Sequence, residues 1–149
     1  MEILIRQAAE SDIQSISRLQ YQWAEEGNVY GFVPESPEQV KAAFNSYLLV
    51  AETNNEIVGF ISGLVSRSEG LAVIPEGESY LEIDNLYVLP EYRMRSIGGG
   101  LVDRCLAEAR EAGVAYALLY SAAKDIPRII RFYEQHDFHS WNVQMFRKL

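Results

Sequence analysis

Three consecutive glycines at the start of an expected helix form the residue cluster whose chemistry is easiest to specify. They occupy positions 98–100, directly before the helical sequence LVDRCLAEAREAG, and Arg93 and Arg95 stand just upstream. Each glycine inside a helix costs about 0.5–1 kcal/mol relative to alanine. The first amides of a helix lack internal partners and carry partial positive charge, while arginines add charge-assisted donors. The cluster favours an anion site, with a pyrophosphate-bearing ligand as the leading candidate.

Other phosphate-binding loops fit these glycines less well. A P-loop requires a lysine after its glycines, and none follows here. The dinucleotide fingerprint G-x-G-x-x-G, started at Gly98, would need a glycine where Asp103 stands. A structural use also remains, because bare backbone lets a helix pack closely on a strand. The glycine spacing alone leaves phosphate binding and close packing nearly even.

Length, composition and charge limit the class of protein. The chain has 149 residues, of which 48% are hydrophobic and 23% charged, which predicts one domain over residues 1–149. No apolar run approaches the roughly 20 residues of a membrane span, and no signal peptide is recognisable. The single cysteine, Cys105, excludes an internal disulfide, and we expect a cytoplasmic protein. A net charge of −8 argues against a nucleic acid partner.

The acidic residues gather in stretches without bases. No Lys or Arg occurs between Arg18 and Lys41, or between Arg67 and Arg93. Most of these carboxylates are interpreted as a solvated surface. A sharper interpretation places a cationic ligand there and an anionic ligand at the glycine turn.

The elements that must position these residues follow from capping and periodicity. Ser11 with Gln14 forms a capping-box pattern, and Ser36, followed by Pro37 and Gln39, forms a second. Two further helices are expected, from the glycine turn to about residue 113 and at 126–136. Strands are expected at 2–8, at 48–53 and 56–66 around an Asn54-Asn55 turn, at 80–88, at 114–121, and through Trp141, Val143 and Met145. This order predicts a single α/β domain with a mixed sheet flanked by about four helices.

The segment LYVLPEYRMRSIGGGLV resembles the central motif of the GNAT superfamily of N-acetyltransferases, L-x-V-x-P-x-x-R-x-x-G-x-G/A-x-x-L. FYEQHDF at 132–138 is similar to the family's F-Y-x-x-x-G-F, and the expected order of elements matches the GNAT fold. The resemblance implies direct transfer of an acetyl group from acetyl-CoA to a primary amine, of a cationic small molecule or a peptide. The motif positions matched are Leu86, Val88, Pro90, Arg93, Gly98 and Leu101.

The sequence departs from the family pattern at several positions. Ser96 stands where the family has its first loop glycine, which costs about 1–2 kcal/mol if the residue is left-handed. Serine is also a good N-cap, and its hydroxyl can donate to a phosphate. Asp137 replaces the glycine before Phe138, and Ile126 and Ile129 replace the common N-x-x-A. Because Gly98 remains, we expect a working CoA site.

The resemblance assigns CoA to the end of the motif strand and to the glycine turn. Backbone groups of Leu86, Tyr87 and Val88 are implied to bind pantetheine and to stabilise the oxyanion. The residues implied to surround the pyrophosphate are Arg93, Met94, Arg95, Ser96, Ile97, Gly98 and Gly99.

Acetyl transfer also requires a proton acceptor, since a lysine-type amine has a pKa of about 10.4. Strand alternation places Glu82 and Asp84 on the face of Leu86 and Val88, where two carboxylates suit amine binding and deprotonation. Glu82 matches the acidic position of the family pattern and is the expected base, directly or through water. The alternative is an exposed strand-end carboxylate. Tyr133 matches the tyrosine implied to protonate the CoA thiolate, the alternative being a packed aromatic.

The acceptor pocket is implied to lie after the first helix. Trp23, Tyr30 and Phe32 line it or belong to the core, and Asp84 is a further substrate-binding candidate. His136 and His139 flank Asp137, but without a fourth ligand we expect no metal site.

A different function class stays open, namely a GNAT-like domain that binds acyl-CoA as a sensor or interaction module. Ser96 and the missing N-x-x-A favour that alternative, whereas Glu82 with Tyr133 favours an enzyme. We expect no membrane partner. The amine and the oligomeric state, including a homodimer, are left open by the sequence.

Overall fold

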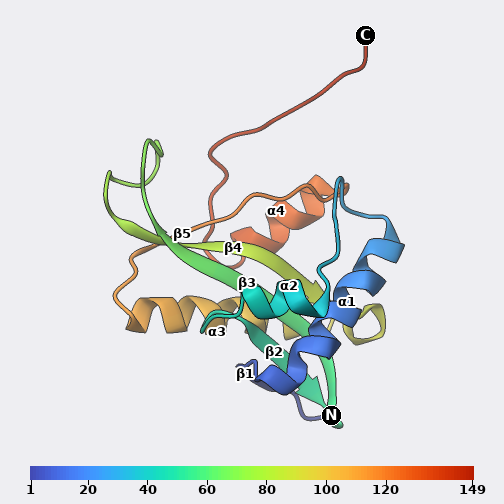
Figure 1. Ribbon diagram of the computed structural model, residues 1–149. Helices are drawn as coiled ribbons and strands as arrows, with labels where there is room; N and C mark the ends of the chain where they lie inside the picture. The colour runs from blue at the N-terminus through green and yellow to red at the C-terminus, as the bar shows by residue number, and fades with distance from the viewer.

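A mixed sheet of five strands, in the order β1-β2-β3-β4-β5, organises residues 1–149, all of which are described by this computed structural model (Figure 1). The strands are antiparallel to their neighbours except for β4 and β5, which run parallel. Their bounds are Leu4–Gln7 for β1, Leu49–Thr53 for β2, Glu56–Arg67 for β3, Ser79–Val88 for β4 and Tyr116–Leu118 for β5.

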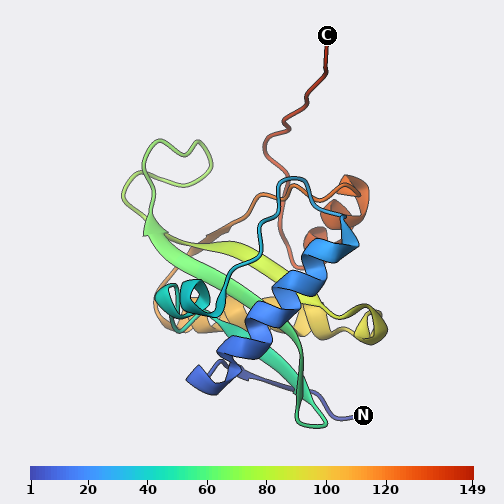
Figure 2. The ribbon, with the colours of Figure 1, turned by 45° about the vertical axis from the view of Figure 1, so that its right-hand side comes forward.

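Four helices cover the sheet, as expected: α1 at Ile13–Glu26, α2 at Pro37–Ala42, α3 at Ile97–Glu111 and α4 at Ile126–Glu134. Helices α1 and α2 lie on one face and α3 on the other, while α4 packs beside the start of α3 (Figures 1 and 2). Short 3₁₀ turns at Glu10–Asp12 and Pro90–Tyr92 precede α1 and α3. None of the helices is long and apolar enough to cross a membrane.

The helix starts agree with the sequence expectation at α2 but not at α1. At α2, Gln39 N donates to Ser36 Oγ at 3.3 Å and Ser36 N donates to Gln39 Oε1 at 2.8 Å, so this capping box is confirmed. The cap predicted at Ser11 is wrong: Asp12 stands at the N-cap position of α1, and its side chain makes no capping hydrogen bond to that helix. Its carboxylate accepts from Ala9 N at 2.7 Å, after a 3₁₀ turn that the capping pattern does not specify.

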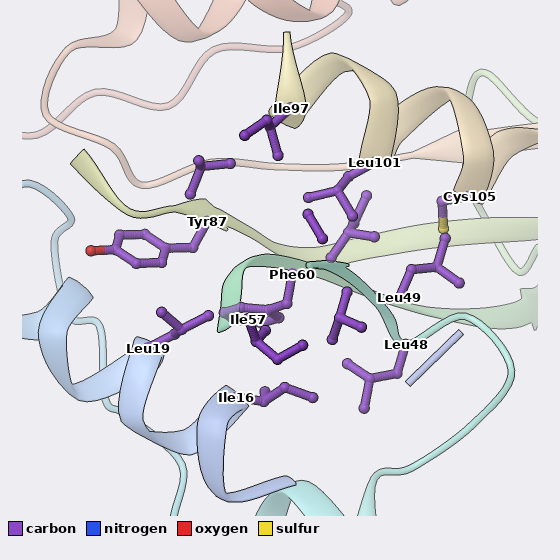
Figure 3. Packing of buried hydrophobic residues seen from close by; sticks show 14 of the residues in the cluster. Ile16, Leu19, Leu48, Leu49, Ile57, Phe60, Tyr87, Ile97, Leu101 and Cys105 are labelled. Atoms are coloured by element: carbon purple, nitrogen blue, oxygen red, sulfur yellow. The ribbon is translucent and has the colours of Figure 1, made fainter. Parts of the chain in front are cut away.

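The core lies on both sides of the sheet (Figure 3). Ile16 and Leu19 of α1 pack from one side, and Leu101 of α3 packs from the other, each with no exposed surface. Burying a leucine or isoleucine side chain contributes about 1.5–3 kcal/mol. Both faces of the central strands are therefore fixed, and with them the position of β4.

The last expected strand is absent. Residues 138–149 form no regular structure, and the chain leads away from the sheet (Figures 1 and 2). Val143 and Met145 are 81% and 88% exposed. Their alternation with polar residues predicts a strand, but a strand forms only beside a partner, and β5 is three residues long.

Candidate active site

A β-bulge separates two parts of β4. Ser62 of β3 lies opposite Asn85, and the next residue, Gly63, lies opposite Ile83, so Asp84 is an extra residue in β4. The pairing with β5 ends at Glu82. Beyond this point the outer edge of β4 has no partner strand, so alternate backbone groups of β4 face away from the sheet.

A cavity of about 1140 Å³ opens where β4 and β5 part. Its walls come from β4 beyond Ile83, the loop 28–35 after α1, the first turn of α3, the segment 119–123 after β5, and α4. One continuous space therefore joins the glycine turn to the free edge of β4 and to the loop after α1.

The glycine turn presents free amide groups to this cavity. The first hydrogen bond within α3 runs from Gly100 N to Ser96 O at 3.0 Å, so the amides of residues 97–99 precede any internal partner. Ser96 is left-handed, with φ of 62°, as the missing glycine implied. Its hydroxyl makes no capping hydrogen bond, contrary to the expectation that serine would cap the helix. The turn therefore carries backbone strain together with unpartnered donors.

The three glycines meet different surroundings. A Cβ on Gly100 would lie 2.7 Å from Ile5 Cδ1, and one on Gly99 would lie 3.2 Å from the ring of His136. A Cβ on Gly98 would make ordinary contact with Phe132, at 3.7 Å. Gly100 therefore permits close packing, as one interpretation of the sequence requires, while phosphate binding at Gly98 stays a prediction.

Arg93 connects the end of α1 to the end of β4. Its Nε donates to Val88 O at 2.8 Å, and its two terminal nitrogens donate to Glu26 at 2.9 and 2.8 Å. The guanidinium lies over the Tyr87 ring, and the Tyr87 hydroxyl donates to the same Glu26 carboxylate at 2.6 Å. Burial disfavours the charge on Glu26, but the hydrogen bonds from Arg93 and Tyr87 outweigh it and lower the pKa of this carboxyl.

The other residues of the arginine segment are placed differently. Met94 lines the cavity with φ of 63°, a second strained position beside Ser96. The guanidinium of Arg95 lies over the Tyr92 ring and donates to Met1 Sδ. Arg95 is not among the cavity-lining residues, so the structure brings Arg93 and Met94 to the cavity but not Arg95.

The bulge overturns the predicted common face of Glu82 with the later residues of the strand. Glu82 lies opposite Leu64, and Leu86 lies opposite Ile61. Positions 61 and 64 of β3 project to opposite faces, so Glu82 and Leu86 do too. The extra residue, Asp84, shifts the alternation by one, and the same correction applies to Val88. Simple alternation fails because it assumes an unbroken ladder.

The two carboxylates also differ in access. Asp84 lines the cavity, whereas Glu82 does not. Partial burial raises the pKa of Asp84, and the negative charges of Glu82 and Glu35 raise it further. Glu35, on the loop after α1, is thus close enough to Asp84 to act on its ionisation.

Aromatic side chains form one wall of the cavity. Trp23 stacks on Tyr87 with ring centroids 5.2 Å apart and contacts Phe32 at 4.3 Å. Tyr30, 56% exposed, lines the cavity nearer to solvent. The three aromatics expected at the acceptor pocket therefore border this cavity, Trp23 and Phe32 as a packed wall and Tyr30 at its rim.

A short backbone bridge joins the loop after α1 to the segment after β5. Val29 pairs with Ala123 as an isolated antiparallel bridge. Tyr30 N donates to Ala122 O, and Lys124 N donates to Asn28 O, both at 2.9 Å. We call residues 28–30 and 122–124 the strap; most of its residues line the cavity.

Tyr133 projects from α4 into the cavity. Its ring makes edge contacts with Phe132 at 4.9 Å and Phe138 at 5.5 Å. Burial raises the pKa of Tyr133 to about 12, so its hydroxyl keeps its proton at neutral pH. Tyr133 is thus a packed aromatic that also lines the cavity, and its role as proton donor stays a prediction.

Comparison with known proteins decides the family. Residues 10–138 match the model of the Acetyltransferase (GNAT) family. The chain belongs to the GNAT family. It is thus an acetyltransferase domain, and its five-stranded sheet with four helices is the GNAT fold. A search of curated proteins finds no relative by sequence.

Solved structures of the same fold cover nearly the whole chain. A predicted acetyltransferase with acetyl-CoA from Clostridium acetobutylicum is 19% identical, covers 99% of this chain and 96% of its own, and has a TM-score of 0.72. A glucosamine-6-phosphate N-acetyltransferase from Arabidopsis thaliana is 18% identical over 99% of each chain, with a TM-score of 0.71. An aminoglycoside acetyltransferase from an uncultured soil metagenomic sample is 16% identical over 100% of this chain and 99% of its own, with a TM-score of 0.73.

The GNAT cavity contains residues that sequence reasoning missed. Gln20 is buried and holds Glu35: Gln20 Nε2 donates to Glu35 Oε1 at 3.0 Å, and Glu35 N donates to Gln20 Oε1 at 2.9 Å. Ser17 Oγ donates to Glu35 O at 2.6 Å. The available signal was a polar residue at position 20 on the apolar stripe that also carries Ile16 and Trp23.

A histidine also lies beside the glycine turn of the GNAT motif. His136 Nδ1 is 2.8 Å from Asp103 Oδ1, and its ring contacts the position that a Cβ on Gly99 would occupy. Both His136 and Asp103 line the cavity. The spacing of His136, Asp137 and His139 raised only the question of a metal site, and nothing in the sequence connected His136 with the turn.

Proposed function

We propose that this GNAT domain transfers an acetyl group from acetyl-CoA directly to a primary amine of a cationic small molecule or a peptide. The observation that carries the proposal is one continuous cavity that joins a helix N-terminus with free amides, a free strand edge and carboxylates. Each of these parts answers one chemical need of the reaction, and no part is far removed from the others along the cavity wall.

The residues around the turn fit the phosphates of CoA. The free amides of residues 97–99 provide a cradle for a pyrophosphate, and Gly98 adds no side chain to it. The unpaired edge of β4 from Leu86 to Val88 can pair with the amide groups of pantetheine in the manner of an added strand. An amide of the same edge can donate to the developing oxyanion. Arg93 holds Val88 O and thereby fixes this edge.

The remaining groups supply proton transfers. A carboxylate of β4, Glu82 through water or Asp84 directly, takes the proton of the ammonium so that the neutral amine can attack the thioester carbonyl. The C–N bond forms and the C–S bond breaks. Tyr133, protonated at neutral pH, gives its proton to the departing thiolate.

The test is an assay of thiol release from acetyl-CoA against a panel of amines. The panel contains a polyamine, an aminoglycoside, an aminosugar, a lysine peptide and a free peptide N-terminus. We expect amine-dependent thiol release with at least one of them, and an N-acetylated product by mass spectrometry. Binding of acetyl-CoA by calorimetry without turnover on any amine would instead support the sensor function, which the left-handed Ser96 in the turn favours.

A further inference from the structure

We propose that Asp84, rather than Glu82, accepts the proton of the attacking amine, and that Glu35, positioned by Gln20, orients the ammonium in front of it. This inference rests on the proposed N-acetyltransferase function and assigns its acid–base groups. It departs from the expectation drawn from the motif, because the bulge separates the motif position from the cavity.

The place of Asp84 in the sheet is the first argument. It is the extra residue of the bulge, and it lies two residues after Glu82, where the pairing between β4 and β5 ends. The free edge that is proposed to hold the thioester begins directly beyond it. A carboxylate here borders both the thioester end and the loop 28–35 of the cavity.

Glu82 is placed less favourably for direct transfer. It is paired with Leu64 on one side and with Leu118 on the other, inside the continuous part of the sheet. It does not line the cavity. Its contribution is electrostatic, because its negative charge favours the protonated form of Asp84.

Glu35 lies on a loop but is fixed by three hydrogen bonds to residues of α1. Both ends of the Gln20 amide bond to it, one to its carboxylate and one to its backbone, and Ser17 bonds its carbonyl. Gln20 and Ser17 are 2% and 3% exposed, so two polar side chains of α1 are buried to fix one residue. Glu35 Oε2 makes no protein hydrogen bond and can accept one from an ammonium group in the cavity.

The charges around Asp84 suit a proton acceptor. Partial burial first, then Glu82 and Glu35, raise its pKa, and all charged groups that act on it are acidic. A raised pKa brings a carboxylate closer to the working pH of a general base. The first ammonium proton passes to Asp84 and on to solvent. After the C–N bond forms, the second nitrogen proton replaces the one that Tyr133 gives to the thiolate, so the protons balance.

The experiment compares Asp84→Asn, Asp84→Glu, Glu82→Gln, Glu35→Gln and Gln20→Leu with wild type, using the best amine of the panel over pH 6–9. For Asp84→Asn we expect kcat/KM to fall by about 10²–10⁴-fold, with loss of the acidic limb of the pH profile. Asp84→Glu should recover part of the rate. Glu82→Gln should lose at least tenfold less than Asp84→Asn.

Gln20→Leu tests the positioning role. It should raise KM for the amine while kcat, the pH profile and the affinity for acetyl-CoA stay near wild type. In the Glu35→Gln background the same change should have a smaller effect, because the two residues act through one contact. Thermal unfolding of every variant controls for folding.

The outcomes separate the two proposals. A wild-type protein that is inactive on every amine would remove the proposed function itself. An active wild type in which Asp84→Asn keeps its rate and pH profile, or in which Glu82→Gln loses as much, would overturn the assignment of Asp84. Equal amine KM in Gln20→Leu and wild type would overturn the role of Gln20.

Discussion

Residues of the glycine turn have different structural roles, although three of them are the same amino acid. Gly100 allows Ile5 of β1 to approach α3, whereas Gly98 lines the cavity, where an added Cβ would make only ordinary contacts. The left-handed Ser96 and Met94 show that the turn keeps its shape without glycine at two positions that strain it. Substitutions here should therefore divide into those that affect folding and those that affect only ligand binding.

Gly98→Val tests the ligand side of this division. A Cβ at this position makes ordinary contacts with Phe132 and Val88, and a branched side chain takes up more of the space at this cavity-lining position. We expect the affinity for CoA to fall more than tenfold, measured by calorimetry, with the melting temperature nearly unchanged. Gly98→Ala is the graded control and should lose less. Unchanged CoA affinity in the valine variant would exclude the turn as the phosphate site.

Tyr133→Phe tests the proton donor. The thiolate of CoA is a fair leaving group, since a free thiol has a pKa of about 8.5, so we expect kcat to fall about 10²-fold, the low end of general acid effects. CoA affinity should change little. Because the pKa of Tyr133 is raised to about 12, its proton is present below that pH and is lost only above it. Between pH 6 and 9 the pH–rate profile of the wild type should therefore have no basic limb caused by Tyr133. The profile of Tyr133→Phe should have the same shape over this range.

At the scale of elements, the site depends on contacts between helices, strands and loops, here called joints, rather than on any single element. Arg93 joins the end of α1 to β4, Gln20 joins α1 to the loop after it, and the bulge lies next to the point where β5 leaves β4. These joints position the strained turn and the carboxylates relative to each other. Weakening one should loosen the cofactor side without unfolding the core.

Arg93→Lys is the direct test of such a joint. Lysine keeps the charge but cannot bond Val88 O and both oxygens of Glu26 in the planar geometry of a guanidinium. We expect CoA affinity to fall about tenfold, equivalent to about 1.4 kcal/mol, measured by calorimetry. Arg95→Lys, at a residue outside the cavity lining, is the matched control. Equal affinities in the two variants would contradict the joint.

At the scale of the whole molecule, charge is unevenly distributed. The chain carries −8, its acids gather in stretches without bases, and Glu35 and Asp84 from two such stretches meet in the cavity. The field around this end should attract cations and repel anions. The turn of α3, with its free amides, is a part of the cavity wall suited to an anion.

A cationic amine should therefore bind with a clear dependence on salt. Charges at solvent-exposed positions are screened over about 10 Å at 0.1 M ionic strength. We expect KM for the best amine to rise several-fold between 0.05 and 0.5 M salt at constant acetyl-CoA, as measured in steady-state kinetics. A best substrate that is neutral or anionic, or a KM that ignores salt, would count against this expectation.

How much the sequence could predict depends on whether a feature is local. The capping box at Ser36 and the turn at Asn54-Asn55, with φ of 49° and 61°, are set by a few adjacent residues and are confirmed. The bulge at Asp84 is a property of pairing between two strands, and the residues of β4 alone do not predict it. The prediction of a last strand is wrong for the same reason, because a strand needs a partner strand and the segment's own residues do not show whether one is present. The contact between Gln20 and Glu35 could not be predicted either, because it depends on how the loop lies against the helix.

The two halves of the strap are joined by main-chain hydrogen bonds, with the carbonyls of Ala122 and Asn28 as acceptors, and the ammonium of Lys124 lies over the Tyr30 ring. Its main-chain hydrogen bonds do not depend on which side chains it carries. Exchange of Tyr30, at the cavity rim, removes the contact with Lys124 but should leave these bonds in place, as should exchange of Val33, which is 79% exposed. We expect acceptor preference to be adjustable at this rim without change to the glycine-turn side of the cavity. A library randomised at these two positions is the natural starting point for retargeting the enzyme to new amines.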